Sequence, residues 1–154
     1  MSNEPHPRIH WPPGWGPDCC DSFVSHRRRL TASPAVVFAQ LTAVPTWPKW
    51  QRGVERTDVT GEIAVGSRFV VVATPHRLDG IVGEIVWPSR FGWAAVSGEL
   101  SFYQSWLMLE WPGGGTEVTF QEAARGPAAL LRNPGRSELT RHWVDALTAT
   151  AQDM

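Results

Sequence analysis

The chain lacks most of the features that would assign it to a class at once. It carries a formal net charge of −1 with no long run of one sign, and no apolar run reaches the roughly 18 residues of a membrane helix. A near-neutral charge argues against nucleic acid or an anionic membrane surface as a partner. The N-terminus also lacks the basic region followed by an apolar region of a secretory signal. We therefore expect a soluble, cytoplasmic protein without a membrane span.

Cysteine is scarce as well, because the two cysteines of the chain are adjacent, at Cys19 and Cys20. Neighbouring cysteines cannot join distant segments. His6 and His10 lie close in sequence, but the spacing matches no familiar zinc site, so we predict neither a metal nor a cofactor. The usual motifs of zinc proteases, serine hydrolases and phosphate-binding loops are absent.

A single domain over residues 21–154 is the simplest reading of the length, with a proline- and tryptophan-rich extension over residues 1–20. Proline favours extended backbone and excludes a helix there. Two alternatives stay open for this extension. It either docks on the domain through Trp11 and Trp15, or it is a disordered tail.

The rest of the chain reads as one strand, two short helices, six strands and a long helix. Ser33-Pro34 is a strong helix start, with a hydroxyl cap before proline at the first helical position. Short glycine and proline turns separate the later segments, which favours antiparallel pairing because a parallel crossover needs a dozen residues or more. The predicted strands cover residues 21–31, 54–60, 68–74, 78–87, 91–96, 100–111 and 116–124, and the short helices lie within 34–44 and 46–50.

The C-terminal part is predicted to be an amphipathic helix that packs on the sheet. Its apolar residues recur at the spacing of one helix face. Asn133-Pro134-Gly135 interrupts the helix, giving a short piece over 127–132 and a main helix over 137–151. We interpret the break as a candidate hinge or mouth. The residues of the apolar face are Leu139, Trp143, Ala146, Leu147 and Thr150.

Five short pieces occur in order along the chain: Leu30–Phe38, Trp47–Trp50, Val65–Phe69, Pro88–Trp93 and Gly115–Phe120. Together they resemble the START-like, helix-grip superfamily (SRPBCC), and most closely its polyketide cyclase/dehydrase and lipid-transport branch. The resemblance implies an α+β fold in which a curved antiparallel sheet of about seven strands surrounds a long C-terminal helix. It also implies an apolar cavity between helix and sheet for lipids, sterols, aromatic polyketides or hormones.

The primary prediction is therefore a protein that binds a small hydrophobic or aromatic ligand in this cavity. A mostly apolar lining with a few polar groups is typical of small-molecule pockets. The same residues would also describe a filled core, and that alternative stays open. On the family's usual strand phase, the lining consists of His26, Arg28, Phe69, Val71, Trp93, Ala95, Tyr103, Ser105, Leu107, Phe120 and Glu122, with Leu139, Trp143 and Ala146 from the helix.

An enzyme of the cyclase or dehydratase kind is the first alternative. His26 could act as a general acid or base near neutral pH. Glu122 would have its pKa raised by burial or lowered by a partner such as Arg28. These three residues could bind a carboxylate or polarise a carbonyl, and they could equally form an internal salt bridge.

The strand predicted over residues 100–111 is apolar on both faces, whereas a sheet with one solvated face should alternate. Either the N-terminal extension covers the outer face, or a second copy of the chain does. A ligand-free interaction or homodimer module is thus the second alternative. Its surface would be the face of Phe102, Trp106 and Met108.

Overall fold

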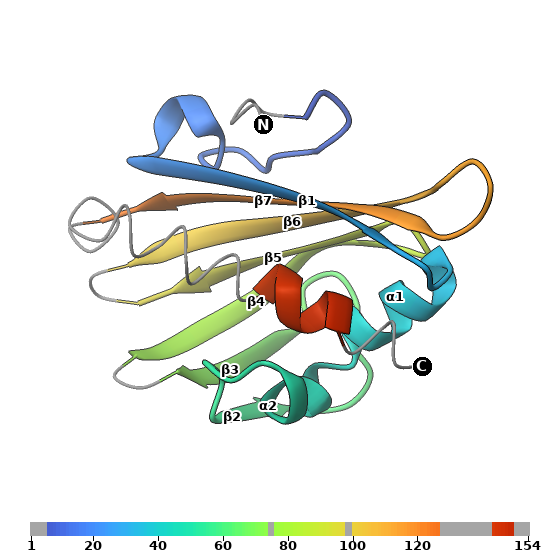
Figure 1. Cartoon of the computed structure of the whole chain (residues 1–154). Coiled ribbons are helices and arrows are strands. Elements are labelled where there is room, and N and C mark those ends of the chain that lie inside the picture. Colours follow the sequence, from blue (N-terminus) through green and yellow to red (C-terminus); the bar gives the residue numbers. More distant parts are fainter. Residues whose placement is uncertain (1–5, 74–75, 98–99, 127–142, 150–154) are drawn as a thin grey trace.

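The computed structural model describes residues 6–73, 76–97, 100–126 and 143–149. Its centre is a seven-stranded antiparallel sheet in the order β1-β7-β6-β5-β4-β3-β2 (Figure 1). The predicted antiparallel architecture is confirmed, and no strand bound differs from the predicted one by more than two residues. The strands are β1 (Ser22–Leu30), β2 (Arg56–Val59), β3 (Arg68–Ala73), β4 (His76–Val86), β5 (Arg90–Val96), β6 (Ser101–Glu110) and β7 (Thr116–Arg125).

Two short helices follow β1, as predicted. Helix α1 (Pro34–Thr42) begins where the Ser33 hydroxyl accepts a hydrogen bond from the Val36 N–H at 3.4 Å. A 3-10 turn leads into α2 (Trp47–Trp50). Trp47 is fully buried, and its indole N–H donates to the Leu41 carbonyl at 2.8 Å. This bond satisfies the polar edge of a large apolar ring, so α2 can insert Trp47 into the core.

Residues 143–149 form a helix that lies across the same face of the sheet as α1 and α2 (Figure 1). Val144 and Leu147 are each 1% exposed and belong to the core. Of the predicted apolar face, Leu147 is therefore in the core and Trp143 packs against it, whereas Val144 is buried although it was not predicted to be. Leu139, the break at 133–135 and the predicted piece over 127–132 lie outside the described residues, so the full length of the helix stays a prediction.

The N-terminal segment, residues 6–20, lies on the opposite face of the sheet, and we call it the strap. The Trp11 ring packs edge-on against Tyr103 and Phe23, with ring centroids 6.0 and 6.2 Å away. The Arg125 guanidinium stacks over Trp15 at 4.0 Å and donates to the Gly14 carbonyl at 3.1 Å. Of the two alternatives for this segment, the structure shows docking.

The face assignment predicted for β6 was wrong. The β6–β7 register places Trp106 opposite Phe120 and Met108 opposite Val118, so the Phe102, Trp106 and Met108 face is the concave one, inside the core. It is therefore not available as the predicted homodimer surface. Tyr103, Ser105 and Leu107 lie on the convex face, and Tyr103 packs against the strap. The error arose because both faces of β6 are apolar, so alternation alone could not choose between them.

Candidate functional site

The concave face of the sheet carries a continuous aromatic wall. Trp93, from the centre of β5, packs against Trp47 and Phe69 with ring centroids 5.3 Å away in both cases. Trp143, on the C-terminal helix, packs against Trp47 at 5.1 Å and against Trp93 at 6.4 Å. Most of these contacts are edge-on or tilted, the arrangement that the quadrupoles of aromatic rings favour. The helix therefore meets the sheet through indole rings.

A chain of buried hydrogen bonds crosses this wall. The side-chain oxygen of Gln104, on β6, accepts from the indole N–H of Trp93 at 2.9 Å and of Trp106 at 3.3 Å. An indole can only donate, so both tryptophans hold the Gln104 oxygen toward themselves. The amide nitrogen of Gln104 then points to Glu122 on β7 and donates to its Oε1 at 2.9 Å. Gln104 and Glu122 are 1% and 3% exposed.

His26 lies next to this chain of hydrogen bonds. The β1–β7 register pairs His26 with Phe120 and Val24 with Glu122, which makes His26 and Glu122 diagonal neighbours on one face. Diagonal neighbours on adjacent strands are about 7–8 Å apart at Cα. The imidazole is 7% exposed and stacks on the Phe120 ring, with centroids 6.2 Å apart. Sequence reasoning placed both polar groups on the concave face, and the structure does so too.

Arg28 does not join this pair. Its guanidinium bonds to Asp145 on the C-terminal helix, with Nε–Oδ1 and Nη2–Oδ1 distances of 3.2 and 3.1 Å. Arg28 pairs with Val118 across β7, four residues from Glu122, or about 13 Å along the strand. The predicted group of His26, Arg28 and Glu122 is therefore divided. Arg28 holds the helix to β1 at the rim of the wall, and it is not the partner of Glu122.

The other predicted lining residues fall into two sets. Phe69, Val71, Trp93, Ala95 and Phe120 are buried in the core that the concave face forms. Tyr103, Ser105 and Leu107 are buried on the convex face, where burial raises the pKa of Tyr103. Ala146 lies on the described part of the helix and is half-buried, whereas Leu139 lies outside the described residues.

Gln104 is the site residue that sequence reasoning missed. The loop after β6 places Glu110 opposite Thr116, and counting back along that hairpin places Gln104 opposite Glu122. Because Glu122 was already assigned to the concave face, this count was the signal that could have found Gln104. The same count brings Trp106 to that face, opposite Phe120.

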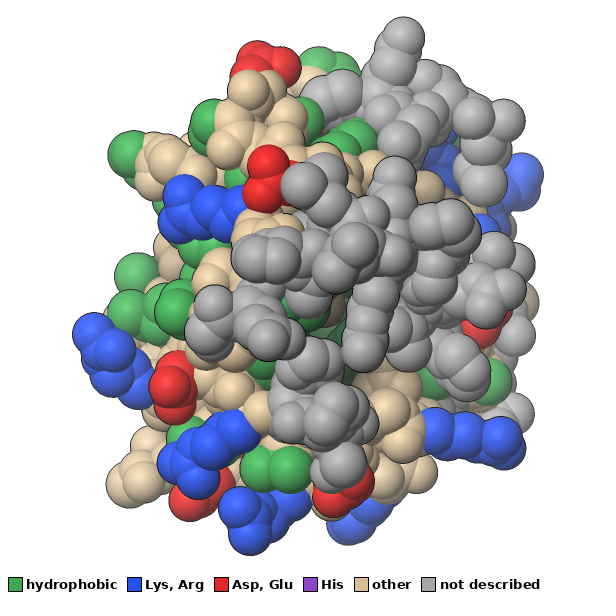
Figure 2. Space-filling view, turned by 90° about the vertical axis from the view of Figure 1, so that its left-hand side faces the viewer, with side chains coloured by type: hydrophobic (Ala, Val, Ile, Leu, Met, Phe, Trp, Pro, Cys, Tyr) green, Lys and Arg blue, Asp and Glu red, His purple; other side chains and the backbone are tan. Residues whose placement is uncertain are grey.

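Within the part of the chain that the structure describes, no group of three or more His, Cys, Asp or Glu side chains could hold a metal ion. His10 bonds to Glu84 at 2.7 Å, and His6 Nδ1 accepts from the Arg8 N–H at 3.1 Å. Among these residues, no helix is long and apolar enough to cross a membrane. Figure 2 shows basic, acidic and apolar side chains interspersed over the described part of one face.

The convex face carries an open hollow of about 500 Å³ near the far edge of the sheet. Asp58, Val70, Asp79 and Val96 face each other there across β2, β3, β4 and β5. Arg68 lines it as well, so the hollow holds charges of both signs. It lies on the opposite face from the aromatic wall.

No known family matches the sequence, and no curated protein matches it. Solved structures do match the fold. A hypothetical protein of Helicobacter pylori superposes with a TM-score of 0.83 at 20% identity, over 98% of this chain and 99% of that chain. Since 98% of this chain is covered, the likeness takes in the strap.

Two further structures match the domain at lower identity. A START superfamily protein of Mycobacterium smegmatis has a TM-score of 0.70 at 10% identity, over 85% of this chain and 97% of that chain. A Thalictrum norcoclaurine synthase in complex with a transition-state analogue has a TM-score of 0.67 at 12% identity, over 86% of this chain and 94% of that chain. Together with the sheet order and the helix on its concave face, these matches show that the chain has the START-like, helix-grip (SRPBCC) fold.

Proposed function

We propose that the protein binds a small hydrophobic or aromatic molecule between the C-terminal helix and the concave face of the sheet. The observation that carries the proposal is the buried chain of hydrogen bonds from Trp93 and Trp106 through Gln104 to Glu122. A filled apolar core gains nothing from burying a carboxyl group, whose desolvation costs several kcal/mol. Polar groups set into an aromatic wall are typical of a site that orients a ligand.

Two further observations support the proposal. The wall is made of flat indole and phenyl rings, which suit an aromatic ligand because each ring offers an apolar face and edge. The Thalictrum synthase of the same fold was solved with a small-molecule analogue bound. The ligand of the present protein would place its apolar body against Trp93 and Trp143, and a polar group near Glu122.

Tryptophan fluorescence offers the direct test, because several indoles line the proposed site. We expect 2-naphthol or anthraquinone to quench the emission saturably, with oleate as an aliphatic probe. The Trp143→Ala variant should bind the aromatic probe at least about tenfold more weakly, the loss expected for one large apolar contact. Trp87→Ala is the matched control, because Trp87 is 70% exposed on the β4–β5 turn. Equal affinity in both variants, or no saturable quenching by any probe, would contradict the proposal.

Acid–base catalysis in the same site is a second candidate function. The observation that favours it is the presence of two titratable side chains, His26 and Glu122, on one buried face of adjacent strands. Such a pair could move a proton to and from a carbonyl compound bound at the wall. Proton exchange at the α-carbon of an enolisable aryl ketone, followed by NMR in deuterated water, measures this activity. It should be lost in His26→Ala and in Glu122→Gln, and an unchanged exchange rate in both would exclude it.

A further inference from the structure

Two arginines, Arg27 and Arg90, lie in one row on the convex side of the sheet. The strand registers place Arg27, Thr119, Leu107 and Arg90 in one row across β1, β7, β6 and β5. Neighbouring strands are about 4.8 Å apart, so the Cα atoms of Arg27 and Arg90 lie about 14 Å apart.

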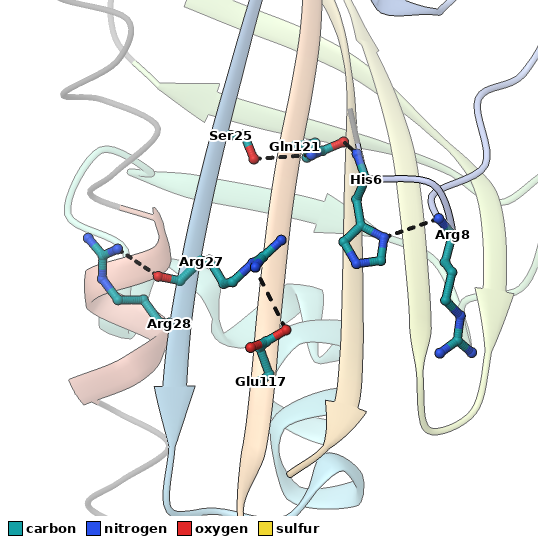
Figure 3. A network of polar contacts seen from close by, with 7 residues as sticks. All are labelled: His6, Arg8, Ser25, Arg27, Arg28, Glu117 and Gln121. Carbon is teal, nitrogen blue, oxygen red and sulfur yellow. Dashed lines mark hydrogen bonds and ion pairs between the residues drawn. The ribbon is translucent and has the colours of Figure 1, made fainter. Parts of the chain in front are cut away.

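The strap brings His6 and Arg8 over this row. The His6 N–H donates to Gln121 Oε1 at 3.1 Å, and Gln121 lies two residues from Thr119 on β7. The Arg8 carbonyl accepts from Arg90 Nη1 at 2.6 Å. Figure 3 shows Arg27 on one side of the His6 ring and Arg8 on the other, whereas Arg28 points to the opposite face of the sheet.

The charges of this cluster are not balanced. Besides burial, the guanidinium groups of Arg27, Arg8 and Arg90 lower the pKa of His6, so all three act on one ring. Arg27 is in a 3.9 Å ion pair with Glu117, and Arg90 bonds to a neutral carbonyl. Glu84, on β4, is bonded to His10 of the strap. The described groups whose charges act on the His6 ring are these three arginines and one carboxylate, Glu117, which leaves two positive charges. Arg29, opposite Glu117 in the register, and Glu84, a diagonal neighbour of Arg90, add one charge of each sign and leave this sum unchanged.

We propose that His6, Arg8, Arg27 and Arg90 form a binding site for a small, doubly charged oxyanion of the phosphate type. A dianion would balance the two positive charges, and the fork of a guanidinium matches two phosphate oxygens at once. The Arg8 N–H donates to His6 Nδ1, which leaves the ring proton on Nε2, so even the neutral imidazole offers a donor. The side chain of Arg27 is 53% exposed, so an anion can enter from solvent.

Binding at this site would join the strap to the sheet, because His6 and Arg8 come from the strap while Arg27 and Arg90 come from β1 and β5. The ligand would be either free phosphate or the phosphate group of a larger molecule. This site lies on the convex face, opposite the aromatic wall, and does not depend on the function proposed for the wall.

Isothermal titration of the full chain with inorganic phosphate, and separately with phenyl phosphate, tests the proposal. We expect one saturable site per chain that weakens as sodium chloride is added. Arg27→Gln should weaken binding about tenfold, the effect of losing one charge-assisted hydrogen bond. Arg77→Gln is the charge-matched control, because Arg77 is exposed on β4 and is not among the groups that act on His6. Tighter binding of phenyl phosphate would identify an esterified ligand, and tighter binding of inorganic phosphate a free one.

NMR titration of the His6 ring gives a second readout, with sodium chloride at the same ionic strength as the control for nonspecific screening of charge. Phosphate should raise the pKa of His6, since a bound anion favours the imidazolium. Glu4 lies outside the described residues, and the Glu4→Gln variant is titrated as well because it removes a carboxylate two residues before His6 in the sequence. Absence of saturable binding in both the unaltered chain and Glu4→Gln would overturn the proposal. Equal weakening by Arg27→Gln and Arg77→Gln would overturn it as well.

Discussion

Replacing Gln104 with leucine should destabilise the fold more than any other single change of a buried amide in the described core. The substitution keeps the volume of the side chain but removes the acceptor of two indole N–H groups, on Trp93 and Trp106, and the donor to Glu122. Each buried N–H left without a partner costs about 1–3 kcal/mol, and the hydrogen bond to a carboxyl group contributes about 1.5–3 kcal/mol. Glu122 keeps a further interaction, so only that one bond is lost there. The lower bounds together give a loss of about 3.5 kcal/mol.

Urea unfolding followed by far-UV circular dichroism measures this loss. With a slope of about 2 kcal/mol per molar urea, the midpoint should fall by about 2 M. Gln51→Leu is the matched control. Gln51 is 3% exposed, and its side-chain oxygen accepts one bond, from the Gly53 N–H at 3.0 Å. It should lose only about 1–2 kcal/mol. If Gln104→Leu loses no more stability than Gln51→Leu, the indole N–H groups do not need Gln104 as an acceptor and the reasoning is refuted.

Three further predictions concern the strap and the helix. Gly92→Ala should release the strap and raise protease cleavage within residues 6–20. The added Cβ would lie 2.9 Å from Cζ of Tyr103, which packs against Trp11 of the strap, and closer still to the Tyr103 hydroxyl. Gly53→Ala, where the nearest contact of the added Cβ is 3.7 Å, should leave cleavage unchanged. Asp145→Asn should lower the free energy of unfolding by less than about 1 kcal/mol, because its ion pair with Arg28 is half-exposed, and this difference should vanish in high salt. A larger loss of stability in a thermal melt would mean that the Arg28–Asp145 pair is the main contact holding the helix. Burial, and after it the charge of Arg27, lowers the pKa of His6 below 6.5, so the unfolded chain binds more protons than the folded one and stability should fall as pH drops below that value. His6→Gln should reduce the dependence of stability on pH, measured by urea titrations at several pH values. An unchanged dependence would contradict the prediction.

Much of the fold followed from local signals in the sequence. The Ser33-Pro34 cap fixed the start of α1, and Gly113 to Gly115, all with positive φ, supplied the turn between β6 and β7. Gly115 also lies where a Cβ would meet the Leu30 carbonyl, so the hairpin passes against the end of β1. Signals of this kind are read from a few neighbouring residues, which is why the order of strands and helices was predicted.

The candidate site was predicted only in part. His26 and Glu122 were identified because a polar side chain on a buried strand face is conspicuous. Gln104 was missed, and Trp106 was assigned to the outer face, because both faces of β6 are apolar. The partners of Gln104 also come from other strands, β5 and β7. The pairing of Arg28 with Asp145 was also missed, since the two residues are 117 positions apart in the chain.

The sequence by itself determined the type and order of the described elements and the antiparallel sheet, because periodicity, caps and turns are local. Only the tertiary structure decided which face of β6 is inside, that the strap covers the other face, and which side chains meet across strands. Those outcomes depend on register and on contacts between distant segments. A shift of one residue in register exchanges the two faces of a strand, and no local pattern decides it where both faces are apolar.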